Sequence, residues 1–130
     1  MRAIHELVAV ALGSILGGGL RLAVSSWPLL QASTFPWPTL IANLAGSFLM
    51  GLAADRLSRQ RPDYGPLMAP FLLTGFCGGL TTFSIFSLES ITLLDDGRPL
   101  AFLLYIGLTM TVAVAGAWAG MRLTTEQEQR

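Results

Sequence analysis

The chain has 130 residues, of which 52% are hydrophobic and 12% charged, and its formal net charge is zero. Soluble domains carry about twice that share of charged residues, so the composition indicates a protein whose solvent is lipid. All the basic residues are arginines in short stretches between apolar runs, which form no basic face and argue against a nucleic-acid partner. A single histidine and a single cysteine cannot build the usual nucleophilic or metal-ligand groups, so we expect no enzyme.

Four apolar segments are long enough, or nearly so, to cross a bilayer, which takes roughly 20 helical residues. They cover residues 4–25, 37–54, 67–94 and 100–121. An arginine ahead of the first segment also fits a cleaved signal peptide, but three further apolar segments favour a membrane span. Little sequence remains outside the spans and no repeat is visible. We therefore predict one all-α transmembrane domain over residues 1–130.

The connectors between the spans are short and contain proline or glycine, so consecutive helices are predicted to be antiparallel neighbours. Four spans place both termini on one side of the membrane. That side carries most of the arginines, and the positive-inside rule therefore predicts cytoplasmic termini in a multi-pass protein of the plasma (inner) membrane. The arginines on the side of the termini are Arg2, Arg56, Arg59, Arg61, Arg122 and Arg130, and those on the other side are Arg21 and Arg98.

Small residues recur at four-residue spacing in the first two spans, a pattern that lets helix backbones approach closely. They pack either within one subunit or between subunits, and the sequence leaves both interpretations open. Four short spans enclose almost no lumen, so a pathway across the membrane is expected to need a second copy. The pairs are Gly13 with Gly17, Ala42 with Gly46, and Ser47 with Gly51.

The middle of the third span, residues 74–89, combines glycines with hydroxyl side chains. Each glycine costs roughly 1 kcal/mol of helix propensity relative to alanine, so we expect the helix to break near Gly78 and Gly79. A break at this depth persists only where it is buried in protein, lines water or binds an ion. Free carbonyls without a nearby carboxylate suit a small monovalent cation such as sodium. The alternative is a glycine-rich kink that threonine hydroxyls close.

Aromatic and hydroxyl residues follow the expected break. Phe83 and Phe86 are three residues apart and lie on one helix face. Such a pair ordinarily packs in a core, but the electropositive edges of the rings also suit an anion. Thr82, Phe86 and Glu89 share a face by the same spacing. The hydroxyls of Thr82 and Ser84 are candidate hydrogen-bond donors to a dehydrated anion.

Three further polar residues lie in or near the spans. Asn43 is a lone amide in the second span, where it either lines a pathway or makes an interhelical hydrogen bond. Arg21 and Glu89 are the charges closest to membrane depth, and each is costly there unless paired or hydrated. Arg21 has the alternative of extending to the membrane surface.

These residues resemble the small bacterial fluoride channels called Fluc or CrcB, over nearly the whole chain. The first span ends with Gly17, Gly18 and Arg21, similar to the glycine-rich G-x-x-x-R ending of the family. Residues 39–51 resemble T-L-x-x-N-x-x-G-S-F-x-x-G. Residues 75–84, followed by Phe86 and Glu89, resemble G-F-x-G-G-x-T-T-F-S-T-F-x-x-E, and this string is the most specific of the three.

The resemblance implies a dual-topology dimer of two antiparallel copies with two fluoride pathways and a central structural sodium ion. Its implied activity is passive, selective fluoride export that lowers fluoride toxicity. It also implies roles for particular residues. Backbone carbonyls of Gly78 and Thr81 would hold sodium. Phe83 and Phe86 would turn their ring edges toward fluoride, and Asn43 would donate to the anion. Ser84 and Tyr105 would belong to a line of hydroxyls, and Glu89 matches the acidic position of the family.

The chain departs from the family pattern in two respects, and two other functions remain as alternatives. Ile85 stands where the motif usually has threonine, which removes one hydroxyl from the implied pathway. The arginine bias is larger than dual topology suggests, and it leaves open a heterodimer with an oppositely biased partner. A small dual-topology multidrug exporter needs a carboxylate deep in the first span, whereas Glu6 lies at its edge. The other alternative is a membrane assembly subunit that transports nothing.

Overall fold

A computed structural model describes residues 1–59 and 65–127, and the described residues outside the connecting turns are helical. Four segments are long and apolar enough to cross a membrane, namely Arg2–Ser25, Trp37–Ala54, Pro70–Asp95 and Pro99–Thr125. The four predicted spans are therefore confirmed. The elements in chain order are α1 (Arg2–Ser25), α2 (Pro28–Gln31), α3 (Trp37–Arg59), η1 (Pro70–Cys77), α4 (Gly78–Leu80), α5 (Ser84–Asp95) and α6 (Pro99–Gln127).

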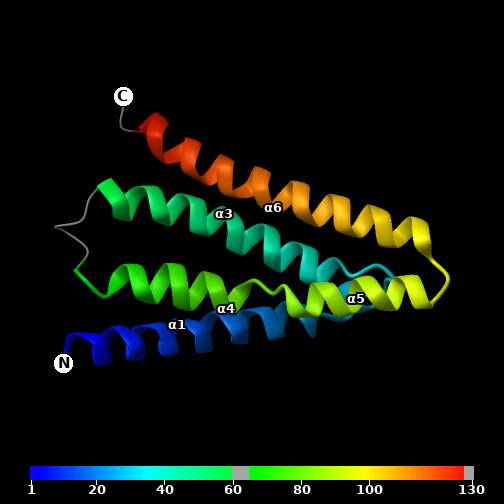
Figure 1. Ribbon diagram of the computed structural model, residues 1–130, viewed down its shortest axis with the longest axis horizontal. Coiled ribbons are helices and arrows are strands. Elements are labelled where there is room, and N and C mark those ends of the chain that lie inside the picture. Colours follow the sequence, from blue (N-terminus) through cyan, green and yellow to red (C-terminus); the bar gives the residue numbers. More distant parts are fainter. Residues whose placement is uncertain (60–64, 128–130) are drawn as a thin grey trace.

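The long helices lie side by side in an elongated bundle, and both ends of the chain lie at the same end of that bundle (Figure 1). The tight link from α5 to α6 lies at the opposite end, where Gly97 adopts a positive φ of 71° that favours glycine. Arg2, in the first turn of α1, and Arg56, in the last turn of α3, are at the end with the termini. Two arginines used for the topology prediction, Arg61 and Arg130, lie outside the described residues.

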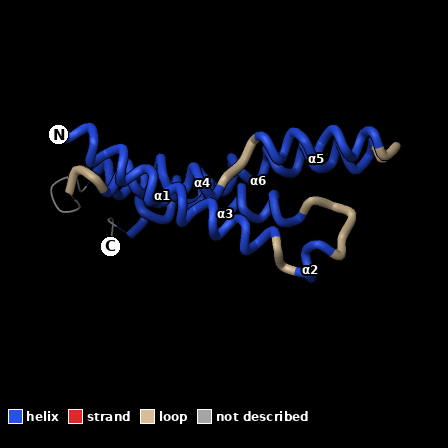
Figure 2. The backbone as a smooth tube through the Cα atoms, turned by 90° about the horizontal axis from the view of Figure 1, so that it is seen from below, coloured by secondary structure: helices blue, strands red, loops and turns tan. Residues whose placement is uncertain are grey.

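The third span is interrupted at residues 81–83, between α4 and α5 (Figure 2). Its first half is a wide π-helical turn that continues into α4, and Thr81 then takes an extended backbone with φ −78° and ψ 156°. The predicted break is confirmed, but it begins just after the glycines. Gly78 and Gly79 themselves remain helical, so they are not the residues that unwind.

The glycines of the third span instead allow close packing against α1. A Cβ atom at Gly79 would lie 2.7 Å from the carbonyl oxygen of Ser14, a distance that real Cβ atoms do not show. In the opposite direction, a Cβ atom at Gly17 would overlap the carbonyl oxygen of Phe76. The small residues of the first span therefore pack inside the subunit, which decides between the two interpretations for this helix.

The small residues of α3 also pack within the chain. A Cβ atom at Gly51 would overlap the backbone of Ala117 in α6, and one at Gly46 would overlap the Cγ2 methyl of Thr81. The second contact brings the middle of α3 directly against the break. Close backbone approach along α3 therefore sets the distance between this helix and residues 81–83.

The break changes the neighbours of the third span. Its first half, η1 and α4, packs mainly against α1, whereas α5 packs against α6. A small apolar cluster of Leu40, Phe86, Leu93 and Tyr105 lies on the α5 side. Many large apolar side chains on the outside are exposed, including Leu16 on α1 and Val114 on α6, as expected for a surface that contacts lipid or a second copy.

Candidate functional site

The side chain of Asn43 bridges α3 to the broken backbone. The backbone N–H of Thr82 donates to Asn43 Oδ1 at 2.7 Å, and Asn43 Nδ2 donates to the carbonyl oxygen of Thr82 at 3.1 Å. Asn43 is buried, with 8% of its surface exposed. The interhelical hydrogen bond considered from the sequence is therefore present. An amide nitrogen has two N–H groups and this contact uses one, so donation to an anion stays a prediction.

Two backbone amides near the break are diverted from their helical partners. In a continuous helix, the N–H of Thr82 would donate to the carbonyl oxygen of Gly78, and the N–H of Ile85 would donate to the carbonyl oxygen of Thr81. Instead the first amide donates to Asn43, and the second donates to the Thr82 hydroxyl at 3.2 Å. The two carbonyls left without these amides are the pair that the family resemblance implies for sodium.

Threonine hydroxyls close the turns on both sides of the break. Thr81 Oγ1 donates to the carbonyl oxygen of Cys77 at 3.0 Å, and Thr82 Oγ1 accepts from the amide of Ile85. The glycine-rich kink closed by threonine hydroxyls is therefore partly right. These hydroxyls do not donate to the carbonyls of Gly78 and Thr81, whose helical amide partners are bonded elsewhere. Among the described residues, no group of three His, Cys, Asp or Glu side chains is placed to hold a metal. The candidate ligand atoms at the break are neutral carbonyl oxygens, and such oxygens suit a hard cation of low charge.

A hollow of about 290 Å³ lies beside the break. It brings together four of the residues predicted for an anion pathway: Asn43, Thr82, Phe83 and Phe86. The two phenyl rings are in contact, with centroids 5.6 Å apart and planes tilted by 49°. Phe83 is 70% exposed and Phe86 only 5%, so the first ring lies on the open side of the hollow and the second in the protein.

Thr109 of α6 lines the same hollow and was not identified from the sequence. It is 3% exposed, and its Oγ1 atom has no hydrogen-bond partner within the part of the chain described. A buried hydroxyl without a partner costs about 1–3 kcal/mol, so its presence calls for an explanation. One signal was available, because Thr109 follows Tyr105 by four residues and shares its helix face.

The carboxylate of Glu89 is held by two hydroxyls from different helices. Thr39 Oγ1 donates to Oε1 at 2.9 Å and Tyr105 OH donates to Oε2 at 2.6 Å. Tyr105 is fully buried and Thr39 nearly so. The three side chains join α3, α5 and α6, and they explain how the fold accommodates a carboxylate at membrane depth.

The structure therefore separates the predicted pathway residues into two places. Glu89 lines a second hollow of about 430 Å³ near α2, together with Thr39 and Ile85, and not the hollow beside the break. Tyr105 is not among the residues that line either hollow, but its ring lies 5.2 Å from that of Phe86 and so links them.

Ser84 and Arg21 lie outside both hollows. Ser84 is exposed, and its hydroxyl lies 3.4 Å from that of Thr82, at the limit of a hydrogen bond. Arg21 is half-buried on α1, and its Nε atom is buried without a hydrogen-bond partner among the described residues. The Arg21 side chain thus neither pairs through Nε nor extends fully to the surface.

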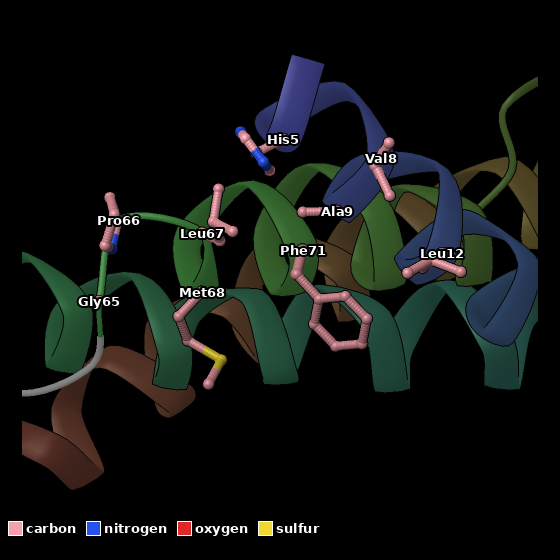
Figure 3. Close-up of a pocket in the computed structure, with 9 residues that line it drawn as sticks. All are labelled: His5, Val8, Ala9, Leu12, Gly65, Pro66, Leu67, Met68 and Phe71. Carbon is pink, nitrogen blue, oxygen red and sulfur yellow. The ribbon is translucent and has the colours of Figure 1, made fainter. Parts of the chain in front are cut away.

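A larger groove, about 600 Å³ in volume, lies between α1 and the start of the third span (Figure 3). It is lined by apolar side chains such as Leu12 and Phe71, with His5 at one edge. None of the residues predicted for ion binding lines it. Its apolar walls offer no route to an anion or a cation, so the site of interest remains the break.

The fold and this site define a small multi-pass membrane protein with a hollow beside a broken helix, lined by apolar side chains together with an amide and hydroxyl groups. A family model described as CrcB-like protein, Camphor Resistance (CrcB), matches residues 8–121. The chain belongs to this family, and the resemblance noted from the sequence is confirmed. The family is one of channels, so the protein is not an enzyme.

Curated relatives match most of the chain. A fluoride-specific ion channel FluC of Rhizobium meliloti is 39% identical over 120 residues, which cover 92% of this chain and 95% of the relative. A protein of the same name from Cereibacter sphaeroides is 41% identical over 119 residues, 91% of this chain and 93% of the relative. A third, from Agrobacterium fabrum, is 38% identical over 119 residues, 91% and 94% respectively.

Proposed function

We propose that the protein is a fluoride-selective channel that lets fluoride leave the cytoplasm passively and so lowers its toxicity. The observation that carries this proposal is the break at residues 81–83, which lies beside a hollow lined by two phenyl rings and an amide. The names of the curated relatives support the same ion. The sites of this chain are consistent with it as follows.

The hollow beside the break suits a small anion because its lining is neutral and offers positive partial charges. Ring edges of Phe83 and Phe86 are electropositive, and Thr109 and Asn43 offer O–H and N–H groups. A dehydrated halide gains most from such donors when it is small, because the charge then lies closest to them. We propose that these four residues contact fluoride, with Thr82 and Ser84 as further hydroxyls.

We propose that a sodium ion binds the carbonyl oxygens of Gly78 and Thr81 and has a structural role. These carbonyls have lost the amides that a continuous helix would direct at them, which supports the assignment. The ion would supply positive charge at the end of each half of the third span. The protein itself contributes the extended backbone at Thr81 that exposes the carbonyls.

A second copy in antiparallel orientation is proposed to complete both sites. The hollow beside the break is open on one side, where Phe83 is largely exposed, and an exposed aromatic ring beside polar groups is a common feature of protein interfaces. The arginine bias between the two ends is the observation that speaks for a heterodimer instead. Tagged copies inserted in both orientations would support the homodimer, and a single orientation would contradict it.

The small multidrug exporter alternative is weakened by Glu6. This is the acidic residue of α1, and it lies near the start of the helix, just after the first turn, where its Oε1 accepts from Arg2 Nε at 3.2 Å. A non-transporting subunit is distinguished by sodium, since a scaffold should show no effect of sodium removal on transport.

The test in cells uses a bacterial strain that lacks its own fluoride export. The protein is produced in the plasma membrane of this strain. Expression of the protein should restore growth in fluoride medium and lower intracellular fluoride. The Phe83→Ile variant, expressed at the same level, is the matched control and should do neither. Equal intracellular fluoride with wild type, variant and empty vector would contradict the proposed function.

A further inference from the structure

We propose that Asn43 is a positioning residue for the sodium site: its amide holds the third span open and keeps the Gly78 carbonyl available to the cation. This inference rests on the sodium site of the proposed function. It gives Asn43 a role beyond donation to the anion.

The Asn43 amide replaces a backbone partner. It places an acceptor and a donor side by side, and these pair with the N–H and the C=O of one residue, Thr82, at 2.7 and 3.1 Å. Asn43 is 8% exposed, so water competes little for these bonds. The contact spans 39 residues of sequence and joins two separate helices. It therefore fixes the position of the break relative to α3.

The alternative partner for the same amide is the carbonyl of Gly78. Without Asn43, the Thr82 N–H would be buried and unpaired, and closing one more helical turn onto Gly78 would satisfy it. That closure withdraws the Gly78 oxygen from a cation. The side chain of Asn43 thus selects between an open third span that offers oxygen ligands and a continued helix that does not.

Other contacts near the break cannot take this role. The hydroxyl of Thr81 is directed to the carbonyl of Cys77, and that of Thr82 accepts from Ile85. Both act within the third span itself, and neither reaches the Thr82 amide. Ser47, one turn from Asn43 on the same helix, lines the hollow beside the break, but Asn43 already pairs with both the N–H and the C=O of Thr82.

The test measures sodium binding through stability, without fluoride and without transport. The purified protein is heated in detergent at increasing NaCl, with N-methylglucamine chloride keeping ionic strength constant. A ligand that binds only the folded state stabilises it by RT ln(1 + [L]/Kd), so the unfolding temperature starts to rise when sodium exceeds its Kd, and the sodium concentration at this onset is called the sodium midpoint. The wild-type protein gives the reference sodium midpoint.

Asn43→Leu removes both bonds at similar volume and should raise the sodium midpoint by at least about ten-fold, because the loss of even one buried hydrogen bond has an effect of this size. Asn43→Asp keeps an acceptor for the Thr82 N–H but loses the N–H donor, and its midpoint should lie between those of wild type and Asn43→Leu. The matched control is Met110→Leu, which alters the same hollow from α6, outside the break at residues 81–83. Its midpoint should stay within about two-fold of wild type.

A wild-type midpoint in Asn43→Leu would overturn the inference and leave Asn43 as an anion contact alone. If Asn43→Leu does not assemble, the sodium midpoint of Asn43→Asp decides, and a wild-type midpoint in that variant overturns the inference. A wild-type protein that sodium does not stabilise would refute the sodium site and this inference with it. Fluoride flux from the same preparation then decides separately whether the channel proposal survives.

Discussion

The carboxylate of Glu89 offers a quantitative test of the fold around the site. Tyr105→Phe removes the hydroxyl that donates to Glu89 Oε2 at 2.6 Å and retains the ring that packs against Phe86. Tyr105 is fully buried, and Thr39 remains as the other hydroxyl that donates to the carboxylate. Hydrogen bonds between membrane helices average about 0.6 kcal/mol, whereas bonds to charged groups are worth about 1.5–3 kcal/mol. We expect a loss of about 1.5 kcal/mol, the lower end of the second range, because the acceptor is a carboxylate that is only half-buried.

The measurement is a double-mutant cycle. Unfolding by dodecyl sulfate in mixed micelles gives the free energy for wild type, Tyr105→Phe, Glu89→Gln and the double variant. The coupling energy should be about 1.5 kcal/mol. Thr111→Val is the control on the same helix, since the Thr111 hydroxyl bonds only to the local carbonyl of Gly107 and should not couple to Glu89→Gln. Additivity of Tyr105→Phe and Glu89→Gln within about 0.5 kcal/mol would refute the reasoning.

Three further predictions test the hollow and the packing around it. Phe83→Ile and Phe86→Ile should each abolish fluoride flux, but only Phe86→Ile should also lower stability, by about 1–2 kcal/mol, because that ring is buried. Measurements of flux and of thermal unfolding on the same variants separate the two effects. Full flux in both variants would contradict the ring-edge mechanism. Thr109→Val should reduce flux about ten-fold while leaving stability equal or higher, because it removes an unpaired buried hydroxyl; unchanged flux would exclude Thr109 from the pathway. Gly79→Ala should destabilise the protein by about 1–3 kcal/mol because the added methyl group would clash with the Ser14 carbonyl. Gly19→Ala is the control and should not destabilise the protein, because Gly19 faces open space. Equal unfolding temperatures of the two variants would contradict the close packing of α1 against the third span.

The four spans were predictable because each is a long apolar run, and lipid leaves the backbone no alternative to helix. The break was also predictable in kind, since glycines and threonines weaken a helix at that depth. Its position was not, because the residue that holds it open, Asn43, is 39 residues away and acts through a tertiary contact. Sequence propensity alone pointed to the glycine pair, which packing against α1 keeps helical.

The candidate site was partly predictable for the same reason. Phe83 and Phe86 lie together because their separation along the chain is short, and local spacing describes such pairs well. The partners of Glu89 come from two other helices, so no spacing rule could identify them. Thr109 was missed because its one sequence signal, the four-residue spacing from Tyr105, does not distinguish it within an apolar helix until the fold places it beside the hollow.

Selective fluoride release from sealed vesicles tests the central claim most directly. Proteoliposomes loaded with equal potassium fluoride and potassium chloride are treated with valinomycin, and ion-selective electrodes follow both anions outside. The wild-type protein should release the fluoride rapidly and retain the chloride, while protein-free vesicles retain both. Release of chloride at the rate of fluoride, or of neither anion, would contradict the assignment.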